Sequence, residues 1–225
     1  MVSAVIFDMD GVIADTEHVW DEVREVLVAD WGGTYSPDAQ RAMMGMSSVE
    51  WSRYMHDELG LQQSAEEINA EVVRRMLERY RTALPLVDGA VAVVRELSAS
   101  LPLAVASSSN RPLIDAVLEA AGITAYFSAT VSSEEVARGK PRPDVYLEAA
   151  RRLGLEPGGC AAVEDSANGI RAAAAAGMWV IAYPNRHYPP DAPSLALADR
   201  VITSLGDLVA TIGSAPARGH ASESA

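Results

Sequence analysis

The stretch AVIFDMDGVIADTE, residues 4–17, decides the fold and raises the first chemical question. Four apolar residues run directly into Asp8 and Asp10, which are separated by one methionine and followed by Gly11. A short apolar run without polar alternation predicts a strand that is buried on both faces, as in a parallel sheet. Such a strand would bring two like charges to one edge of the sheet, so other groups are needed to hold these charges together.

The same pattern recurs along the chain. Continuous apolar runs lie at 101–106, 161–163, 178–183 and 201–202. Segments with helical spacing separate them, and we expect helices that begin at Asp88 and Ser166 and others that end at Gly122, Gly154 and Gly177. Strands and helices that alternate in this way predict an α/β fold with a doubly wound, Rossmann-like parallel sheet.

Residues 15–85 interrupt this alternation. They contain no strand-like run but three segments with helical spacing, at 20–31, 48–59 and 65–84. We therefore predict an all-helical cap at 15–85, inserted after the first strand, and an α/β catalytic core formed by 1–14 and 86–213. Such an insertion is suited to cover the strand ends as a lid. The small and polar residues 214–225 are predicted to form a disordered tail.

The composition limits the partners. The 225 residues carry a formal net charge of -13, which argues against nucleic acid and anionic membranes as main partners because it repels phosphate groups. The first residues carry no basic region, and no apolar run reaches membrane-spanning length. The single cysteine, Cys160, excludes a disulfide within the chain. We expect a cytoplasmic protein that is a monomer or a weak homo-oligomer.

Four polar segments follow predicted strands or lie just beyond them, where ligands bind in this fold. They are the pair Asp8 and Asp10, the serines from Ser107, the loop with Lys140, and the pair Glu164 and Asp165. Lys140 is the one lysine among 18 Lys and Arg residues, and its compact ammonium suits a tight site that the wide fork of arginine does not. Each segment alone also fits a turn, a helix cap or a solvated loop.

The chemistry of the four segments is complementary. Up to four carboxylates at one sheet edge would repel each other, and a hard divalent cation would relieve this repulsion. Oxygen ligands favour Mg²⁺ over zinc. A carboxylate that attacks a phosphate dianion needs the same metal, an ammonium group and hydroxyl donors. Lys140 and Ser107 would supply the last two.

With these motifs, the sequence resembles the haloacid dehalogenase superfamily, in its branch of phosphatases and phosphomutases with a helical cap after the first strand. The motifs are DMDGV at 8–12, Ser107 in VASSS, Lys140 in GKPRPD and VEDS at 163–166. The resemblance extends to about residue 213. It implies a magnesium-dependent phosphatase whose substrate is a small phosphorylated metabolite, with a sugar or deoxysugar phosphate as the first choice.

The resemblance also implies a role for each motif. Asp8 is the nucleophile that forms an aspartyl-phosphate, and Asp10 is the general acid for the leaving oxygen and then the base for water. The transferred phosphoryl group is expected to bind Ser107, Ser108, Lys140 and main-chain amides around Met9 and Gly11. The expected Mg²⁺ ligands are Asp8, the main-chain carbonyl of Asp10, Asp165 and, directly or through water, Glu164.

Several residues separate the alternatives within the family. A carboxylate at Asp10 argues against dehalogenation, and the lack of a cap lysine argues against phosphonate hydrolysis through a Schiff base. Hydrolysis and a β-phosphoglucomutase-like phosphoryl transfer remain. That mutase has a histidine where this chain has Trp20 and an arginine where it has Ser48, although Arg53 or Arg75 could replace the lost anchor. We therefore expect a phosphomonoester hydrolase, with the mutase as the alternative.

Two further expectations concern binding. A non-catalytic protein that binds phosphate or a partner would also suit the acidic surface and the cap, but it has no need of the acid Asp10. Substrate specificity is expected to depend on residues of the cap and two of the core, namely His18, Trp20, Gly45, Ser47 and Trp51, with Asn110 and Arg111. Trp20 also fits a packing role, and His18 also fits a solvated position.

Overall fold

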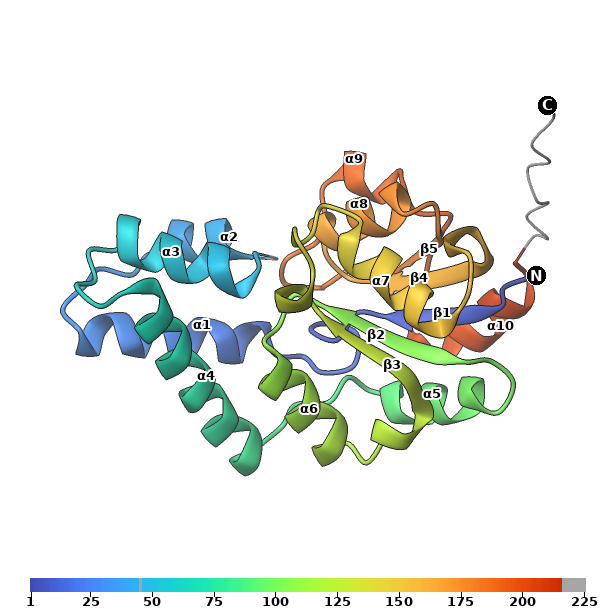
Figure 1. The fold of residues 1–225 in the computed structure, drawn as a ribbon, viewed down its shortest axis with the longest axis horizontal. Helices are drawn as coiled ribbons and strands as arrows, with labels where there is room; N and C mark the ends of the chain where they lie inside the picture. Colours follow the sequence, from blue (N-terminus) through green and yellow to red (C-terminus); the bar gives the residue numbers. More distant parts are fainter. Residues whose placement is uncertain (45, 216–225) are drawn as a thin grey trace.

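The computed structural model describes residues 1–44 and 46–215, and Figure 1 shows a parallel sheet with helices on both faces. The six strands have the order β3-β2-β1-β4-β5-β6. Strand β1 (Ala4–Phe7) lies between β2 (Leu103–Ser107) and β4 (Cys160–Glu164) and pairs in parallel with both. Every residue of these three strands is buried, which explains their continuous apolar sequence. The predicted doubly wound α/β fold is confirmed.

Three further strands complete the sheet, namely β3 (Phe127–Ser132), β5 (Trp179–Ala182) and β6 (Arg200–Val201). Strands β5 and β6 lie where apolar runs predict them. The apolar pattern does not predict β3, because β3 is an edge strand in which only the last two residues are buried. Its alternation of apolar and polar residues reflects a sheet edge that is open on one side.

Two sets of helices cover the two faces of the sheet. Helices α5 (Ala90–Ser98), α6 (Arg111–Ala120) and α10 (Leu208–Gly213) share one buried cluster with Val5 and Phe7. Helices α7 (Asp144–Leu153) and α8 (Ala167–Ala175) share the other with Ala4 and Ile6, and the short α9 (Ala192–Leu195) packs on α8. Alternate residues of β1 therefore face opposite helical layers, as the pleat of a strand requires.

The helix ends agree with most of the predicted caps. Ser166 caps α8, and Gly154 follows α7 with a φ of 70°. Helix α5 begins after Gly89, one residue later than predicted from Asp88, and Gly89 has a φ of 83°, which glycine adopts without strain. Short 3₁₀ turns are η1 (Thr124–Tyr126), η2 (Ser133–Glu135), η3 (Pro157–Gly159) and η4 (Leu205–Asp207).

Four helices lie together at one end of the sheet, on the left in Figure 1. They are α1 (Glu17–Asp30), α2 (Pro37–Met43), α3 (Ser48–Glu58) and α4 (Ala65–Thr82). Their buried side chains form one continuous cluster with the sheet face that α5 and α6 cover, and the rings of Trp20 and Trp51 meet edge to face within it, with centroids 5.9 Å apart. The sequence pattern does not predict α2, which spans seven residues and buries only Ala39 and Met43.

Two chain segments connect these four helices to the sheet, and they pair with each other. The amide of Asp15 donates to the carbonyl of Pro85 at 2.8 Å, and the amide of Val87 donates to the carbonyl of Ile13 at 3.0 Å. Ala14 and Leu86 form an antiparallel bridge between these two contacts. A small change of backbone angles at this crossing would move the four helices relative to the sheet. The proposed division into a cap and a core places its boundaries at the same crossing.

Two predictions fall on residues that the structure leaves out. Gly45 and residues 216–225, which make up most of the predicted tail, lie outside the described residues. Within the described ranges, every helix is too short or too polar to cross a membrane.

The start of α4 allows a direct test of helix capping. The Ser64 hydroxyl accepts a hydrogen bond from the amide of Glu67 at 3.3 Å, and the Glu67 carboxylate accepts one from the amide of Ser64 at 2.9 Å. The substitution Ser64→Ala should lower the free energy of unfolding by about 1 kcal/mol, measured by urea denaturation. Ser64→Asp keeps a capping oxygen and should retain most of the stability. Equal stability of Ser64→Ala and the parent would contradict this role.

Candidate active site

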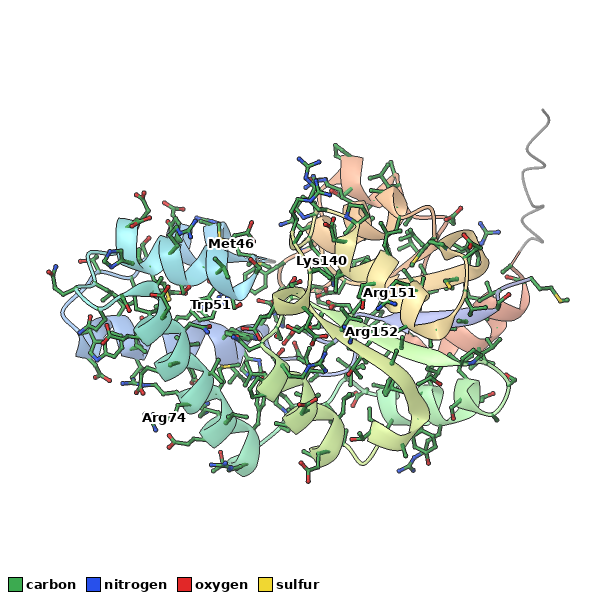
Figure 2. The ribbon with its side chains drawn as sticks, in the orientation of Figure 1. Met46, Trp51, Arg74, Lys140, Arg151 and Arg152 are labelled. Carbon is green, nitrogen blue, oxygen red and sulfur yellow. The ribbon has the colours of Figure 1, made fainter. Side chains whose placement is uncertain are left out.

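The predicted site residues meet at the carboxyl ends of three neighbouring strands. Asp8 follows β1, Ser107 ends β2, and Glu164 ends β4. These ends lie side by side because β1 is placed between β2 and β4. Lys140 comes from the loop between η2 and α7, and Figure 2 shows it between the sheet and the four helices α1–α4.

Lys140 is buried between two carboxylates. Its Nζ donates to Asp8 Oδ1 at 2.8 Å and to Glu164 Oε1 at 2.6 Å. Burial alone would lower the pKa of Lys140, but the charges of Asp8 and Glu164 outweigh burial and hold this pKa above its ordinary value. The side chain therefore stays a cation at neutral pH. The short contacts of Nζ with two carboxylates suit a compact ammonium, which is narrower than an arginine fork.

Glu164 is saturated with hydrogen bonds. Its Oε1 also accepts from the Tyr146 hydroxyl at 2.7 Å, and its Oε2 accepts from the amides of Asp165 and Ser166 and from the Ser166 hydroxyl at 3.1 to 3.2 Å. A Cβ at Gly169, in the first turn of α8, would lie 1.8 Å from Glu164 Oε1. The backbone of α8 thus closes on this carboxylate. Glu164 is held in the right place to orient Lys140 toward Asp8.

Asp10 interacts with a different set of groups from Asp8. Its Oδ1 accepts hydrogen bonds from the Thr16 hydroxyl and, at 3.2 Å, from Trp20 Nε1 at the start of α1. Its Oδ2 accepts from the Ser109 hydroxyl at 2.7 Å and more weakly from Ser107 at 3.4 Å. The two aspartates therefore have different partners. Asp8 contacts Lys140. Asp10 is held by residues 107–110 at the end of β2, here called the serine loop, and by the start of α1.

Three carboxylates form a cluster that could hold a metal ion. One oxygen each of Asp8, Glu164 and Asp165 lies within 4.8 Å of the others. Burial first, and then the charge of Glu164, raise the pKa of Asp8 to about 8 and the pKa of Asp165 well above its ordinary value. A Cβ at Gly11, which has a φ of 81°, would lie 1.8 Å from Asp165 Oδ2. Buried carboxylates that repel each other in this way are a donor set that fits a hard divalent cation.

The serine loop after β2 is held in place by the edge strand. The hydroxyl of Ser132 donates to the carbonyl of Ser109 at 2.7 Å, and the hydroxyl of Ser133 donates to the carbonyl of Ser107 at 3.2 Å. The Ser107 hydroxyl accepts from the amide of Ser109 at 3.0 Å. The Ser108 hydroxyl is buried and has no partner among the described residues. It is thus a donor that a bound phosphoryl oxygen could satisfy.

Main-chain groups just after β1 form hydrogen bonds with one another. The amide of Gly11 donates to the carbonyl of Ala14 at 2.7 Å, and the carbonyl of Met9 accepts from the amides of Ile13 and Ala14. Met9 itself is fully buried. A role of Met9 and Gly11 in phosphate binding stays a prediction, whereas the close approach of Gly11 to Asp165 is a direct observation.

The predicted specificity residues are distributed over different environments. Trp20 is buried and contacts Asp10, while His18 is exposed. Ser47 precedes α3, and the Glu50 carboxylate accepts hydrogen bonds from the amide of Ser47 at 2.8 Å and from its hydroxyl at 2.7 Å. Asn110 Nδ2 donates to Glu134 Oε1 at 2.6 Å and to Asn69 Oδ1 at 3.1 Å, so Asn110 bridges the core and α4. The specificity roles of all these residues stay predictions.

A small cavity of about 50 Å³ lies between the sheet edge and the four helices. Its lining consists of Asp8, Asp10, Glu17, Trp20, Arg24, Met43, Met44, Met46, Trp51, Ser108, Ser109, Lys140, Asp165 and Ser166. Figure 2 shows Met46 and Trp51 on the side of the cap helices and Lys140 facing them. Sequence reasoning missed Glu17, Arg24 and the methionines. The sequence pattern could have indicated that Arg24 is buried, since it lies four residues after Trp20 on the otherwise apolar face of α1.

A family model and characterised relatives match most of this chain. Residues 2–177 match the model of the haloacid dehalogenase-like hydrolase family. Hexitol phosphatase B of Escherichia coli (strain K12) is 34% identical over 215 residues, which cover 93% of this chain and 95% of that protein. The bifunctional riboflavin kinase/FMN phosphatase of Arabidopsis thaliana is 32% identical over 208 residues, and this chain spans only 54% of its length.

Solved structures show the same arrangement. The crystal structure of CbbY from Rhodobacter sphaeroides in complex with phosphate superposes with a TM-score of 0.82 at 26% identity, and the match covers 92% of this chain and 96% of that one. The family match includes β1, the serine loop, Lys140 and the Glu164–Asp165 pair. The chain belongs to the haloacid dehalogenase-like hydrolase family.

Proposed function

We propose that this protein is a magnesium-dependent phosphomonoester hydrolase that acts on a small phosphorylated metabolite through an aspartyl-phosphate. The family match and the phosphatases among the relatives confirm the predicted class, a hydrolase of phosphoric monoesters. One observation carries the proposed mechanism: Asp8 lies 2.8 Å from a buried ammonium, whereas Asp10 is held on the other side by Thr16, Trp20 and Ser109. Two carboxylates with such different partners are suited to two different roles.

Asp8 is the proposed nucleophile. Its carboxylate attacks phosphorus, the bond to the leaving oxygen breaks, and a mixed anhydride forms between Asp8 and the phosphoryl group. Lys140 offsets the like charge of the carboxylate and the phosphate dianion, and Glu164 keeps Lys140 in position. The free Ser108 hydroxyl supports the proposal, because it offers a hydrogen bond to the transferred group.

Asp10 is the proposed acid and base. It donates a proton to the leaving oxygen, and then takes a proton from the water that attacks the anhydride, so that Asp8 is released as a carboxylate. Hydrogen bonds from Thr16 and Trp20 come from the start of α1. The position of Asp10 therefore depends on the place of the cap helices relative to the sheet.

A divalent metal suits the family and the cluster of Asp8, Glu164 and Asp165, and we propose Mg²⁺ because the available donors are oxygen atoms. When bound, it would supply positive charge to the transferred phosphoryl group. Asp8 and Asp165 are its proposed side-chain ligands, with the carbonyl of Asp10. Glu164 has both oxygens occupied by Lys140, Tyr146 and the start of α8, which favours an indirect contribution.

The likeness to hexitol phosphatase B supports a sugar or polyol phosphate as substrate. Neither of the two arginines considered as substitutes for the missing mutase arginine, Arg53 and Arg75, lines the cavity, and Ser48 donates to Glu134 at 3.1 Å, so the mutase alternative is disfavoured in that form. Arg53 is exposed, and Arg75 pairs with Asp30 and Glu71. Location in the cytoplasm and a monomeric or weakly associated state stay proposals.

The nucleophile is tested by Asp8→Asn. This change should reduce phosphate release from sugar phosphates to below about a thousandth of the parent rate, because an amide cannot form the anhydride. Release is measured with a panel of phosphorylated sugars and polyols in the presence of Mg²⁺, and isomerised sugar phosphates are measured in the same tubes. Circular dichroism serves as the control for folding. A folded Asp8→Asn protein with more residual activity would contradict the covalent mechanism, and isomerised product without phosphate would favour the mutase.

The acid is tested by Asp10→Asn with two kinds of leaving group. Formation of the phosphoenzyme from p-nitrophenyl phosphate should persist, since nitrophenolate leaves without a proton, whereas hydrolysis of sugar phosphates should fall by about 100-fold or more. Rapid-quench measurement of the phosphorylated protein separates this step from its hydrolysis. Parent-like turnover of sugar phosphates by Asp10→Asn would remove Asp10 from the acid role.

The metal is tested by thermal denaturation. The raised pKa of Asp8, about 8, means that the metal-free fold binds a proton more tightly than the unfolded chain, so this contribution to stability is lost as pH rises toward 8. Mg²⁺ favours the ionised carboxylates, and saturating MgCl₂ should raise Tm by about 5 °C at pH 8 and by less at pH 5. The shift should disappear in Asp165→Asn. An equal shift at both pH values would contradict this assignment.

A further inference from the structure

Arg24 is a buried arginine in the wall of the active-site cavity. It lies on α1, is only 7% exposed and lines the same cavity as Asp8 and Lys140. Arg24 and Lys140 are the two buried cationic side chains in the described ranges. Neither the family motifs nor the proposed reaction gives Arg24 a role.

The two buried cations differ in their partners. Lys140 contacts two carboxylates, Asp8 and Glu164. Within residues 1–44 and 46–215, no ion pair or hydrogen bond joins Arg24 to another residue, and its Nε is buried without a partner. A buried donor without a partner lowers stability by about 1 to 3 kcal/mol, and more for a charged group. Arg24 therefore retains hydrogen-bonding capacity that the protein itself does not use.

Two aromatic rings fix the guanidinium. Its central carbon lies 4.7 Å from the centroid of Trp20 and 5.0 Å from the centroid of Trp51. Contacts with the faces or edges of aromatic rings hold a guanidinium in place and leave its N–H groups free to point elsewhere. Trp20 also donates to Asp10, so one side chain contacts both the proposed acid and Arg24. Arg24 is thus linked through Trp20 to Asp10, the group proposed to donate a proton to the leaving oxygen.

A purely structural role of Arg24 would explain its contacts with the two tryptophan rings but not its buried charge. Asp10, Glu17, Asp21 and Tyr35 lie near enough to influence Arg24 electrostatically, yet none of them forms an ion pair or hydrogen bond with it. Asp10 is already bound by Thr16, Trp20 and Ser109, and Asp21 accepts from the Tyr35 hydroxyl at 2.7 Å. A methionine or leucine would fill the space between two tryptophans without burying a charge. The described residues thus supply no hydrogen-bond partner for the buried charge of Arg24.

We propose that Arg24 binds an anionic group, a phosphate or a carboxylate, on the leaving-group side of the substrate. The enzyme then prefers phosphorylated metabolites that carry a second anion over neutral sugar phosphates. The inference rests on the proposed phosphatase function. The guanidinium fork matches the paired oxygens of both groups, and the cavity that it lines also contains the proposed nucleophile Asp8.

The test compares two pairs of substrates that differ in the second anion. Fructose bisphosphate is compared with fructose monophosphate, and phosphogluconate with sorbitol phosphate, by phosphate release with Mg²⁺. The parent protein should show a higher kcat/KM for the acidic member of at least one pair, and the identity of that pair distinguishes phosphate from carboxylate. Arg24→Gln should lower the ratio of acidic to neutral kcat/KM by about 10- to 100-fold, as expected for a hydrogen-bonded charge pair. Arg24→Lys should lower it less.

Arg53→Gln is the matched control, because Arg53 is an exposed cap arginine outside the cavity. It should leave both ratios unchanged. If Arg24→Gln does not fold, the parent ratios and Arg24→Lys still decide the question. A parent that hydrolyses p-nitrophenyl phosphate but does not prefer the acidic member of either pair overturns this inference and leaves the proposed function intact. If Arg24→Gln leaves the ratio of acidic to neutral kcat/KM unchanged, this inference is likewise overturned and the proposed function stays intact. A lack of turnover on every compound overturns the proposed function itself.

Discussion

The buried contact between Lys140 and two carboxylates is the constraint on which the rest of the site depends. Removing an ammonium from water is unfavourable, and here Asp8 and Glu164 compensate for it at 2.8 and 2.6 Å. Glu164 is in turn bound by Tyr146, by the start of α8 and by its own neighbouring amides. Two strand ends, one loop and two helices thus converge on a single cation. This network keeps a point charge at the proposed nucleophile before any substrate arrives.

The cap helices supply the second half of the site. Asp10 receives hydrogen bonds from Thr16 and Trp20, which lie at the point where the chain leaves the sheet. Trp20 also packs against Arg24, so the proposed acid, an aromatic ring and a guanidinium without a hydrogen-bond partner among the described residues form one connected wall. A movement at the paired segments around Ala14 and Leu86 would change all three together. Acid chemistry and substrate recognition are therefore expected to depend on the same closure of the cap.

The fold was predictable where sequence patterns are local and strong. Central strands are buried on both faces, and their continuous apolar runs mark β1, β2, β4 and β5 directly. The edge strand β3 and the short helix α2 escaped prediction, because partial exposure and short length weaken periodicity. The failure to predict β3 matters for the site, since Ser132 at the end of β3 and Ser133 just after it hold the serine loop. An edge element with a weak pattern thus positions groups that the motifs identify easily.

The sequence by itself determined which residues meet at the candidate site, because Asp8, Asp10, Ser107, Lys140 and Asp165 lie at or near strand ends in a spacing that parallel sheets bring together. Only the tertiary structure decided which partner each of these groups binds. It showed that Glu164 binds Lys140 and α8, that Asp10 accepts hydrogen bonds from Thr16 and Trp20 at the start of α1, and that Arg24 lines the cavity without a hydrogen-bond partner among the described residues. Hydrogen-bond partners and burial depend on contacts between segments far apart in the chain, and no local pattern contains that information.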